Sequence, residues 1–470
     1  MKKRKRERSR QLTINIDTGK KKQTLTGFGV SGAWWAQVVG GWTETDESSG
    51  KPKRERIAEL LFDLENGIGI TQYRYNIGAG SKESGKGKYS DETRRASSFE
   101  TAPGVYDWSR DGNAVWFMRE AARLGADEIV MFVNSPIERL TNNHKAHLDK
   151  AGKTNLSRGN YGEFAKYVLD VASHFKGEGL PIKYISPVNE PVWIWTGGQE
   201  GCHYRPGQVY KVMKTFAKEL KNYPALKNVK LSGAENGDIR WFNKIYTYIM
   251  ASKPLKDVTD AVDFHSYFLP VPSSVPGFIA KKLNDRLAFV KRYKRFTDKF
   301  FPGVPLKTSE WCHMQGGRDY GIDSAVVQAK VMAEDLIYLD VVSWQLWVAL
   351  SPVDYCDGLI YYNDDRSFEL TKRYYAFSNF SKFIRPGAVR IDAPQSVEDA
   401  YLLVFEQKDN YAAVVINYGE SDKEIGFDLP ARTARAYVTD KDNDLAEFAV
   451  SDVKNITLRP RSITTVIVEK

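Results

Sequence analysis

The stretch 182–190, IKYISPVNE, indicates the fold, because an apolar run rich in β-branched residues ends there in a carboxylate, Glu190. The stretch 304–310, VPLKTSE, repeats this arrangement and ends in Glu310. A parallel β/α barrel gathers the C-terminal ends of all its strands at one mouth. Two strands that each end in a glutamate therefore predict a barrel with two acids at its mouth.

Strand-like runs alternate with segments whose apolar residues have helical spacing, such as 112–124, 160–175, 207–221 and 323–338. The eight strand-like runs are 24–32, 70–78, 128–136, 182–190, 229–236, 261–268, 304–310 and 341–350. We therefore predict an α/β fold, a (β/α)8 TIM barrel over 24–387. An open doubly wound sheet would also alternate, but residues 84–88, SGKGK, lack the spacing of a phosphate-binding loop.

The pattern changes after residue 387. Residues 388–470 hold short alternating runs separated by turn residues, which predicts an appended antiparallel β-sandwich. Residues 11–23 contain another alternating run, which could add a strand to that sandwich.

The net charge of +9 at first indicates a nucleic-acid partner, but the first ten residues carry six of these nine charges. We expect residues 1–10 to be a disordered basic tail, with binding to RNA or to an anionic membrane as the alternative. No stretch reaches the roughly 18 apolar residues of a membrane helix, and no apolar signal segment follows the tail. We therefore expect neither a nucleic-acid partner nor a membrane.

The three cysteines, Cys202, Cys312 and Cys356, form no CxxC spacing and no even set. Such sparse usage favours reduced thiols and predicts a cytoplasmic location.

Enzymatic hydrolysis of a glycosidic bond generally requires two carboxyl groups that face each other across the bond. Glu190 is the candidate acid/base, with Asn189 placed to hydrogen-bond a sugar 2-hydroxyl. Pro191 is expected to hold Glu190 in an extended conformation, and Trp193 with a neighbouring negative charge would raise its pKa.

Glu310 is the candidate nucleophile. The fourth and seventh strands lie on opposite sides of an eight-stranded barrel, which fits the separation of about 5–5.5 Å of a retaining mechanism. An ionised nucleophile needs a cation nearby, and Arg74, in the apolar run YRYN, is the best candidate.

The ordered set of motifs resembles glycoside hydrolase family 30. The matching stretches are GFGVSGAWWA (27–36), YRYNIGAG (73–80), FVNSP (132–136), PVNEP (187–191), TSEW (308–311) and YYAFSNFSKFIRPG (374–387). The resemblance implies a retaining (β/α)8 glycosidase with Glu190 as acid/base and Glu310 as nucleophile. It also implies that Arg74, Asn134, Asn189 and Tyr267 surround the sugar on the glycone side of the bond.

The loop 198–203, GQEGCH, resembles that of members that cut β-1,6-linked galactan. Gln199, Glu200 and His203 would then contact sugar hydroxyls, with a structural ion pair of Glu200 as the alternative.

Other candidate site residues are expected at the mouth of the barrel. His265 and Tyr267, at the end of the sixth strand, are expected to contact the sugar or the nucleophile. Trp347 is preferred over Trp344 as a stacking platform because it lies nearer the strand end, and Trp35 belongs to the same aromatic-rich mouth. The pair His144 and His147 has no third ligand nearby, so we expect no metal, and no other cofactor is called for.

The sequence therefore predicts a retaining β-glycosidase acting on β-linked, galactose-containing oligosaccharides, foremost β-1,6-galactan fragments. The alternatives are a β-glucosidase, β-xylosidase or β-1,6-glucanase of the same fold, or a non-catalytic carbohydrate-binding protein.

Overall fold

The computed structural model describes residues 12–269, 274–394, 398–429 and 433–470. The predicted basic tail, 1–10, lies outside the described residues. One sheet of parallel strand segments forms the centre of the molecule, in the order β11-β10-β9-β6-β3-β15-β14-β13-β12. The segments are β3 (Gly27–Ser31), β6 (Gln72–Asn76), β9 (Glu128–Phe132), β10 (Ile182–Ser186), β11 (Lys230–Leu231), β12 (Ala234–Asn236), β13 (Val262–His265), β14 (Leu306–Glu310) and β15 (Ser343–Leu346).

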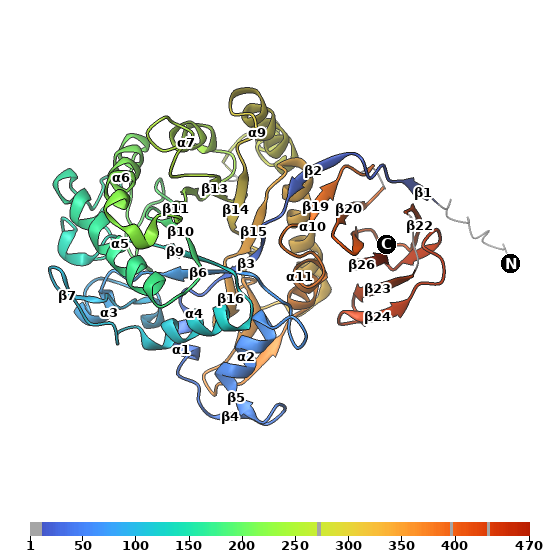
Figure 1. The fold of residues 1–470 in the computed structure, drawn as a ribbon, viewed down its shortest axis with the longest axis horizontal. Coiled ribbons are helices and arrows are strands. Elements are labelled where there is room, and N and C mark those ends of the chain that lie inside the picture. Colours follow the sequence, from blue (N-terminus) through green and yellow to red (C-terminus); the bar gives the residue numbers. More distant parts are fainter. Residues whose placement is uncertain (1–11, 270–273, 395–397, 430–432) are drawn as a thin grey trace.

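The sheet closes on itself through its fifth strand. Only Ser232 and Gly233 separate β11 from β12, so the two segments are halves of one interrupted strand. β11 pairs with β10 on one side, and β12 pairs with β13 on the other. The remaining pairs follow the chain around to β15 and β3, which are also parallel neighbours. The predicted eight-stranded β/α barrel is therefore confirmed (Figure 1).

Helices surround the strands (Figure 1). Four of them fall in the predicted helical segments: α4 (Gly112–Leu124), α5 (Tyr161–Gly177), α6 (Pro206–Glu219) and α10 (Ile322–Tyr338). Others are α2 (Lys53–Phe62), α7 (Asn243–Met250), α9 (Arg286–Phe300) and α11 (Lys372–Ser381). In α5 the buried residues Phe164, Val168, Val171 and Phe175 recur at helical spacing, so one apolar stripe covers the sheet.

The C-terminal part is a sandwich of two sheets, coloured orange to red in Figure 1 apart from two blue strands that come from the N-terminal end of the chain. The larger sheet is antiparallel and consists of β2 (Lys21–Thr24), β19 (Val389–Ile391), β20 (Ala400–Glu406), β21 (Asn410–Asn417), β26 (Ser462–Glu469), β23 (Ala434–Thr439) and β24 (Ala446–Ala449). The smaller consists of β1 (Leu12–Asn15), β22 (Lys423–Asp428) and β25 (Ile456–Leu458), with β1 parallel to β22. Two N-terminal strands thus belong to the sandwich, while the division of the chain at residue 387 stays a prediction.

The central strands of the larger sheet, such as β20 and β21, are buried on both faces. In β20, Val404 packs in the sandwich core whereas its neighbour Leu403 belongs to the main core shared with the barrel, as the period of two along a strand requires. Asn379 of α11 donates to the carbonyl of Tyr437 (2.9 Å) and to the hydroxyl of Thr465 (3.0 Å). The sandwich is therefore fastened to the barrel helices through apolar packing and buried hydrogen bonds.

Over the described part of the chain, every helix falls short of the length and apolarity needed to cross a membrane.

Candidate active site

The two predicted acids lie at the C-terminal end of the barrel. Glu310 is the last residue of β14. Glu190 stands four residues beyond the end of β10, in the loop that follows the strand. His265 ends β13, and a third glutamate, Glu235, lies in β12. The mouth of the barrel therefore gathers three carboxylates and one imidazole.

The backbone of Glu190 is left-handed, with φ of 40°, so the expected extended conformation is wrong. Its N–H donates to the carbonyl of Glu235 at 2.9 Å, and Glu235 itself has φ of 54°. This bond between the loop after β10 and strand β12 overrides the local bias that Pro191 exerts. Non-glycine residues in this region carry backbone strain, which the surrounding structure must hold.

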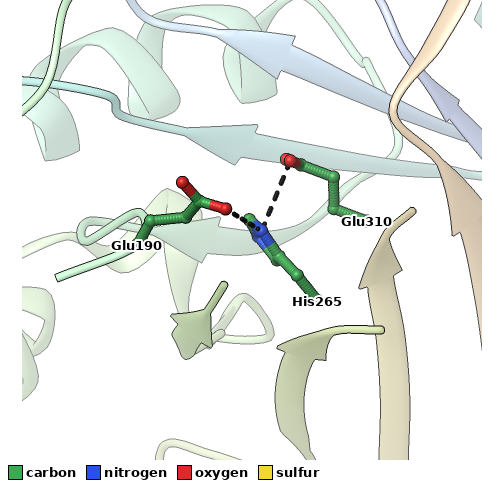
Figure 2. Close-up of side chains that lie close together, drawn as sticks. All are labelled: Glu190, His265 and Glu310. Atoms are coloured by element: carbon green, nitrogen blue, oxygen red, sulfur yellow. Dashed lines mark hydrogen bonds and ion pairs between the residues drawn. The ribbon is translucent and has the colours of Figure 1, made fainter. Parts of the chain in front are cut away.

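The imidazole of His265 lies between the two predicted acids (Figure 2). Its Nδ1 is 3.0 Å from Oε1 of Glu190 and 3.3 Å from Oε1 of Glu310. These three atoms all lie within 4.8 Å of one another. The carboxylates are thus close enough to contact the same nitrogen.

His265 is buried among carboxylates that favour its protonated form. Burial alone would lower its pKa, but the negative charge of Glu310 and hydrogen bonds to Glu190 and Glu235 raise the pKa to about 10. Its Nε2 lies 3.2 Å from Oε2 of Glu235. Burial works against ionisation of Glu235 as well, yet Arg74 and His265 lower the pKa of that carboxyl to about 2. The carboxylates around His265 therefore favour its positively charged form, and its contact with Glu310 fits the expected contact with the nucleophile.

Glu310 is held by a cation and a hydroxyl. Arg74 donates from Nη1 to Oε2 of Glu310 at 2.7 Å, and the Tyr267 hydroxyl donates to Oε1 at 3.0 Å. Burial raises the pKa of the Glu310 carboxyl above its usual value, while the charges of His265 and Arg74 oppose that rise. Charge-assisted hydrogen bonds of this kind orient the carboxylate as well as stabilise its ionised form.

A chain of amides fixes Asn189. Its Nδ2 donates to Oδ1 of Asn134 at 3.0 Å, and Asn134 donates to Oδ1 of Asn76 at 3.1 Å. Arg74 also donates to Oδ1 of Asn189, at 3.4 Å. Arg74 and Asn134 thus lie beneath the site and position the groups that face it.

A cleft of about 680 Å³ opens over these residues, a volume typical of small-molecule sites. Seven of the predicted site residues line it: Asn189, Glu190, Trp193, Gln199, Tyr267, Glu310 and Trp347. Trp347 meets Trp34 edge-on at 5.4 Å, whereas Trp344 is buried and donates from Nε1 to Asp335 at 3.0 Å. The preference for Trp347 over Trp344 therefore agrees with the side that each ring occupies.

Trp35, Glu200 and His203 do not belong to the described lining of the cleft. The Trp35 indole is buried, donates to the carbonyl of Ser31 at 2.8 Å and packs edge-on against Phe117. Trp35 is hence a core residue, with its ring packed inward in the segment that follows β3.

Glu200 holds two loops together instead of facing a sugar. It accepts from the Ser81 hydroxyl at 2.6 Å and from the Ala79 N–H at 3.1 Å, and burial raises its pKa to about 8. His203 lies with Nδ1 3.2 Å from the carbonyl of Trp193. Both residues hydrogen-bond to segments beside the cleft, and neither belongs to its described lining.

The ring nitrogens of His147 and His265 already have hydrogen-bond partners. Both ring nitrogens of His147 are engaged, one 2.9 Å from the carbonyl of Leu148 and the other accepting from the Lys88 N–H at 3.0 Å. The group Glu190, His265 and Glu310 has suitably spaced ligand atoms, and a metal there would have to compete with the hydrogen bonds that the two ring nitrogens of His265 make to Glu190 and Glu235.

The sequence-based prediction missed Glu235 and the loop after it. Asn236, Gly237, Asp238, Arg240, Trp241 and Phe242 all line the cleft. The sequence did carry a signal, because Glu235 is the next-to-last residue of the strand-like run 229–236, close to the strand end where barrel enzymes place their functional residues.

Comparison with known proteins places the chain among glycoside hydrolases. A model described as O-Glycosyl hydrolase family 30 matches residues 11–361, more than half of the chain. An endo-β-1,6-galactanase of Hypocrea rufa is 25% identical over 281 residues, 54% of this chain and 55% of the relative. A glucuronoxylanase of Bacillus subtilis is 22% identical over 323 residues, 66% of each chain. The matched part is thus about half the length of the first relative.

The fold is shared with solved structures. The crystal structure of a conserved exported protein from Bacteroides fragilis has a TM-score of 0.86 at 22% identity, covering 97% of this chain and 100% of that one. The likeness therefore extends over barrel and sandwich together.

Proposed function

Because the chain belongs to O-glycosyl hydrolase family 30, and is thus an enzyme that hydrolyses O-glycosyl bonds in a carbohydrate substrate, we propose that it is a retaining β-glycosidase for β-1,6-linked galacto-oligosaccharides. In this proposal Glu310 is the nucleophile and Glu190 the acid/base.

The observation that carries the mechanism is the spacing of the two acids. Oxygens of Glu190 and Glu310 approach the same nitrogen of His265 at 3.0 and 3.3 Å, and all three atoms lie within 4.8 Å of one another. Retaining enzymes hold their carboxyl groups about 5–5.5 Å apart, whereas inverting enzymes need about 6.5–9.5 Å to admit a water between them and the sugar. The short spacing favours retention.

In the first step Glu310 attacks the anomeric carbon while the bond to the leaving oxygen breaks. Glu190 gives its proton to that oxygen, and a covalent glycosyl-enzyme forms. In the second step Glu190 removes a proton from water, the water oxygen bonds to the anomeric carbon, and Glu310 leaves as a carboxylate. Arg74 and Tyr267, which hold the two Glu310 oxygens, stabilise that carboxylate before attack and after release.

The charges of the site fit these roles. Three carboxylates, on Glu190, Glu235 and Glu310, face two cations, Arg74 and His265. The carboxylates outnumber the cations by one, so the site as a whole favours uptake of one proton. Glu190 is the acid with the most exposed side chain, at 16% against 6% for Glu310 and 0% for Glu235, so it can exchange that proton with water and leaving group.

The substrate is proposed from the relative and from the lining of the cleft. The Hypocrea rufa relative is an endo-β-1,6-galactanase. Gln199, from the loop that resembles galactan-cutting members, lines the cleft, and Trp347 offers a ring for a sugar face. A polar group that meets a single hydroxyl discriminates more strongly than apolar fit does.

Product analysis tests the substrate. The protein should cleave β-1,6-galactotriose faster than β-1,6-glucan or xylan oligomers of equal length. Preference for the glucan or the xylan would refute the galactan proposal and leave the mechanism standing.

A cytoplasmic location is proposed separately, from the three buried cysteines, which are all unpaired. Fractionation of the native cells tests this location, since enzyme recovered chiefly outside the cytoplasm would contradict it.

A further inference from the structure

Trp241 lines the cleft, and the chemistry proposed above leaves it without a role. Its side chain is 49% exposed, and Trp193, which lines the same cleft, is 50% exposed. Single exposed apolar residues are ordinary on protein surfaces. Two half-exposed indoles at one cleft indicate a surface kept open for a ligand.

The loop that carries Trp241 is tightly bonded. Asn236 donates from Nδ2 to the carbonyls of Asp238 and Trp241, both at 2.6 Å. Arg240 pairs with Asp238 at 2.6 Å and donates to the carbonyl of Leu269 at 2.7 Å. The indole therefore projects from a fixed backbone, which lowers the entropy lost when a ligand binds.

The backbone of the loop is also strained. Phe242, a bulky residue that lines the cleft, has φ of 62° and ψ of −16°. Such a residue rarely adopts this conformation, and outliers of this kind gather at functional sites. Both the bonds and the strain keep aromatic side chains at the cleft instead of letting them fold into the core.

Both indoles lie on the Glu190 side of the cleft. A Cβ at Gly237 would lie 2.7 Å from Oε1 of Glu190, so the backbone of this loop touches the carboxyl group. The N–H of Trp193 donates to the carbonyl of Glu190 at 3.0 Å. A general acid must lie beside the leaving oxygen, whereas Glu310 faces the anomeric carbon. The indoles are hence placed for the leaving group.

We infer that Trp241 and Trp193 form a platform for the sugar unit on the leaving-group side of the cleaved bond. The inference rests on the proposed function and adds that the substrate is a chain that continues past that bond. Indoles stack on the apolar C–H faces of pyranose rings. The enzyme accordingly works best on oligosaccharides with at least one further sugar, and less well on substrates with small leaving groups.

The test compares two leaving groups in the full-length protein. Trp241→Ala should lower kcat/KM for β-1,6-galactotetraose about tenfold. Hydrolysis of β-galactosyl fluoride should change less than about twofold, because fluoride has no ring to stack. Trp241→Phe, which keeps an aromatic face, should recover part of the loss. Tyr248→Ala is the matched control, since Tyr248 is 67% exposed on α7 and absent from the described lining of the cleft.

Equal losses on tetraose and fluoride, or an unchanged rate on the tetraose, would overturn the platform. A wild-type enzyme that hydrolyses the fluoride but leaves the tetraose intact would instead refute the galactan linkage. The same comparison then uses whichever glucan or xylan oligomer it cleaves. The contribution of the platform can also be measured without hydrolysis. For this, calorimetry measures binding of that oligomer to the inactive variant Glu310→Gln, and to the same variant that also carries Trp241→Ala. We expect Kd to rise about tenfold, and an unchanged Kd would count against the inference.

Discussion

Arg74 and Glu310 form an ion pair of 2.7 Å across the interior of the barrel, between β6 and β14. The Arg74 side chain is fully buried, and the guanidinium also lies 4.1 Å above the ring of Phe132. Burying a guanidinium without a carboxylate partner would cost folding free energy. The pairing with Glu310 therefore explains why Arg74 can be buried. The pair joins the second and seventh strands and fixes the acid that we propose as nucleophile.

Glu310→Ala should abolish hydrolysis of a β-galactosyl fluoride or aryl β-galactoside, by about 10⁴-fold or more, because no covalent intermediate can form. Added azide should restore turnover and yield the α-configured glycosyl azide, detected by proton NMR. Glu369→Ala, at an exposed position of β18 (Phe368–Leu370), is the control and should behave as wild type. Residual activity above about 1% without azide would assign the nucleophile elsewhere.

His265→Gln should lower kcat about 100-fold, because it removes a positive charge that separates two carboxylates. It should also move the acidic limb of the pH–rate profile to higher pH, since Glu310, which must be ionised to attack, then loses a stabilising cation. A residue that only supports the fold would change stability and leave the limb in place. His174→Gln, on the stacked surface pair with Trp108, is the matched control.

Glu235→Gln should destabilise the protein by about 3 kcal/mol at pH 7, measured as the shift of the urea unfolding midpoint. The folded pKa of Glu235, about 2, lies below its ordinary value of 4.5. Its contribution to stability is therefore present above pH 4.5 and is lost as the pH falls toward 2. The wild type and the variant should converge over that window. A difference that stays constant with pH would show that shape, not charge, explains the loss.

Glu200→Gln should have the opposite sign. The folded pKa of Glu200, about 8, lies above its ordinary value of 4.5, so ionisation of the unfolded chain destabilises the fold as the pH rises from 4.5 to 8. The variant should be more stable than wild type by about 3 kcal/mol at pH 7 and equal to it below pH 4.5. Glu65→Gln, at an exposed position, should show no such trend. A destabilised variant at pH 7 would mean that the carboxylate itself is required.

Much of this fold could be predicted from local sequence patterns. Period-two and helical spacing found the eight strands and the helices compared above, because burial on a sheet or on a helix stripe leaves its mark on neighbouring residues. Because the strands of a barrel end at one mouth, Glu190 and Glu310 could be expected to lie close together. Because Arg74 is flanked by apolar residues, it could be expected to be buried and to form an ion pair. The backbone of Glu190 was predicted wrongly, because its conformation depends on a hydrogen bond to Glu235, 45 positions away in the sequence.

By itself the sequence determined the barrel, the sandwich and the pair of acids, since each depends on residues that recur within a strand or a helix. Only the tertiary structure decided which polar and aromatic side chains face the cleft. Trp34, Trp35 and Trp347 look alike in a sequence, but ring direction depends on packing partners such as Phe117, which lie far along the chain. Likewise His265 became a cation among carboxylates because three strands bring Glu190, Glu235 and Glu310 around one imidazole. The charge of a buried group depends on its neighbours in space, and these neighbours cannot be identified from the order of residues along the chain.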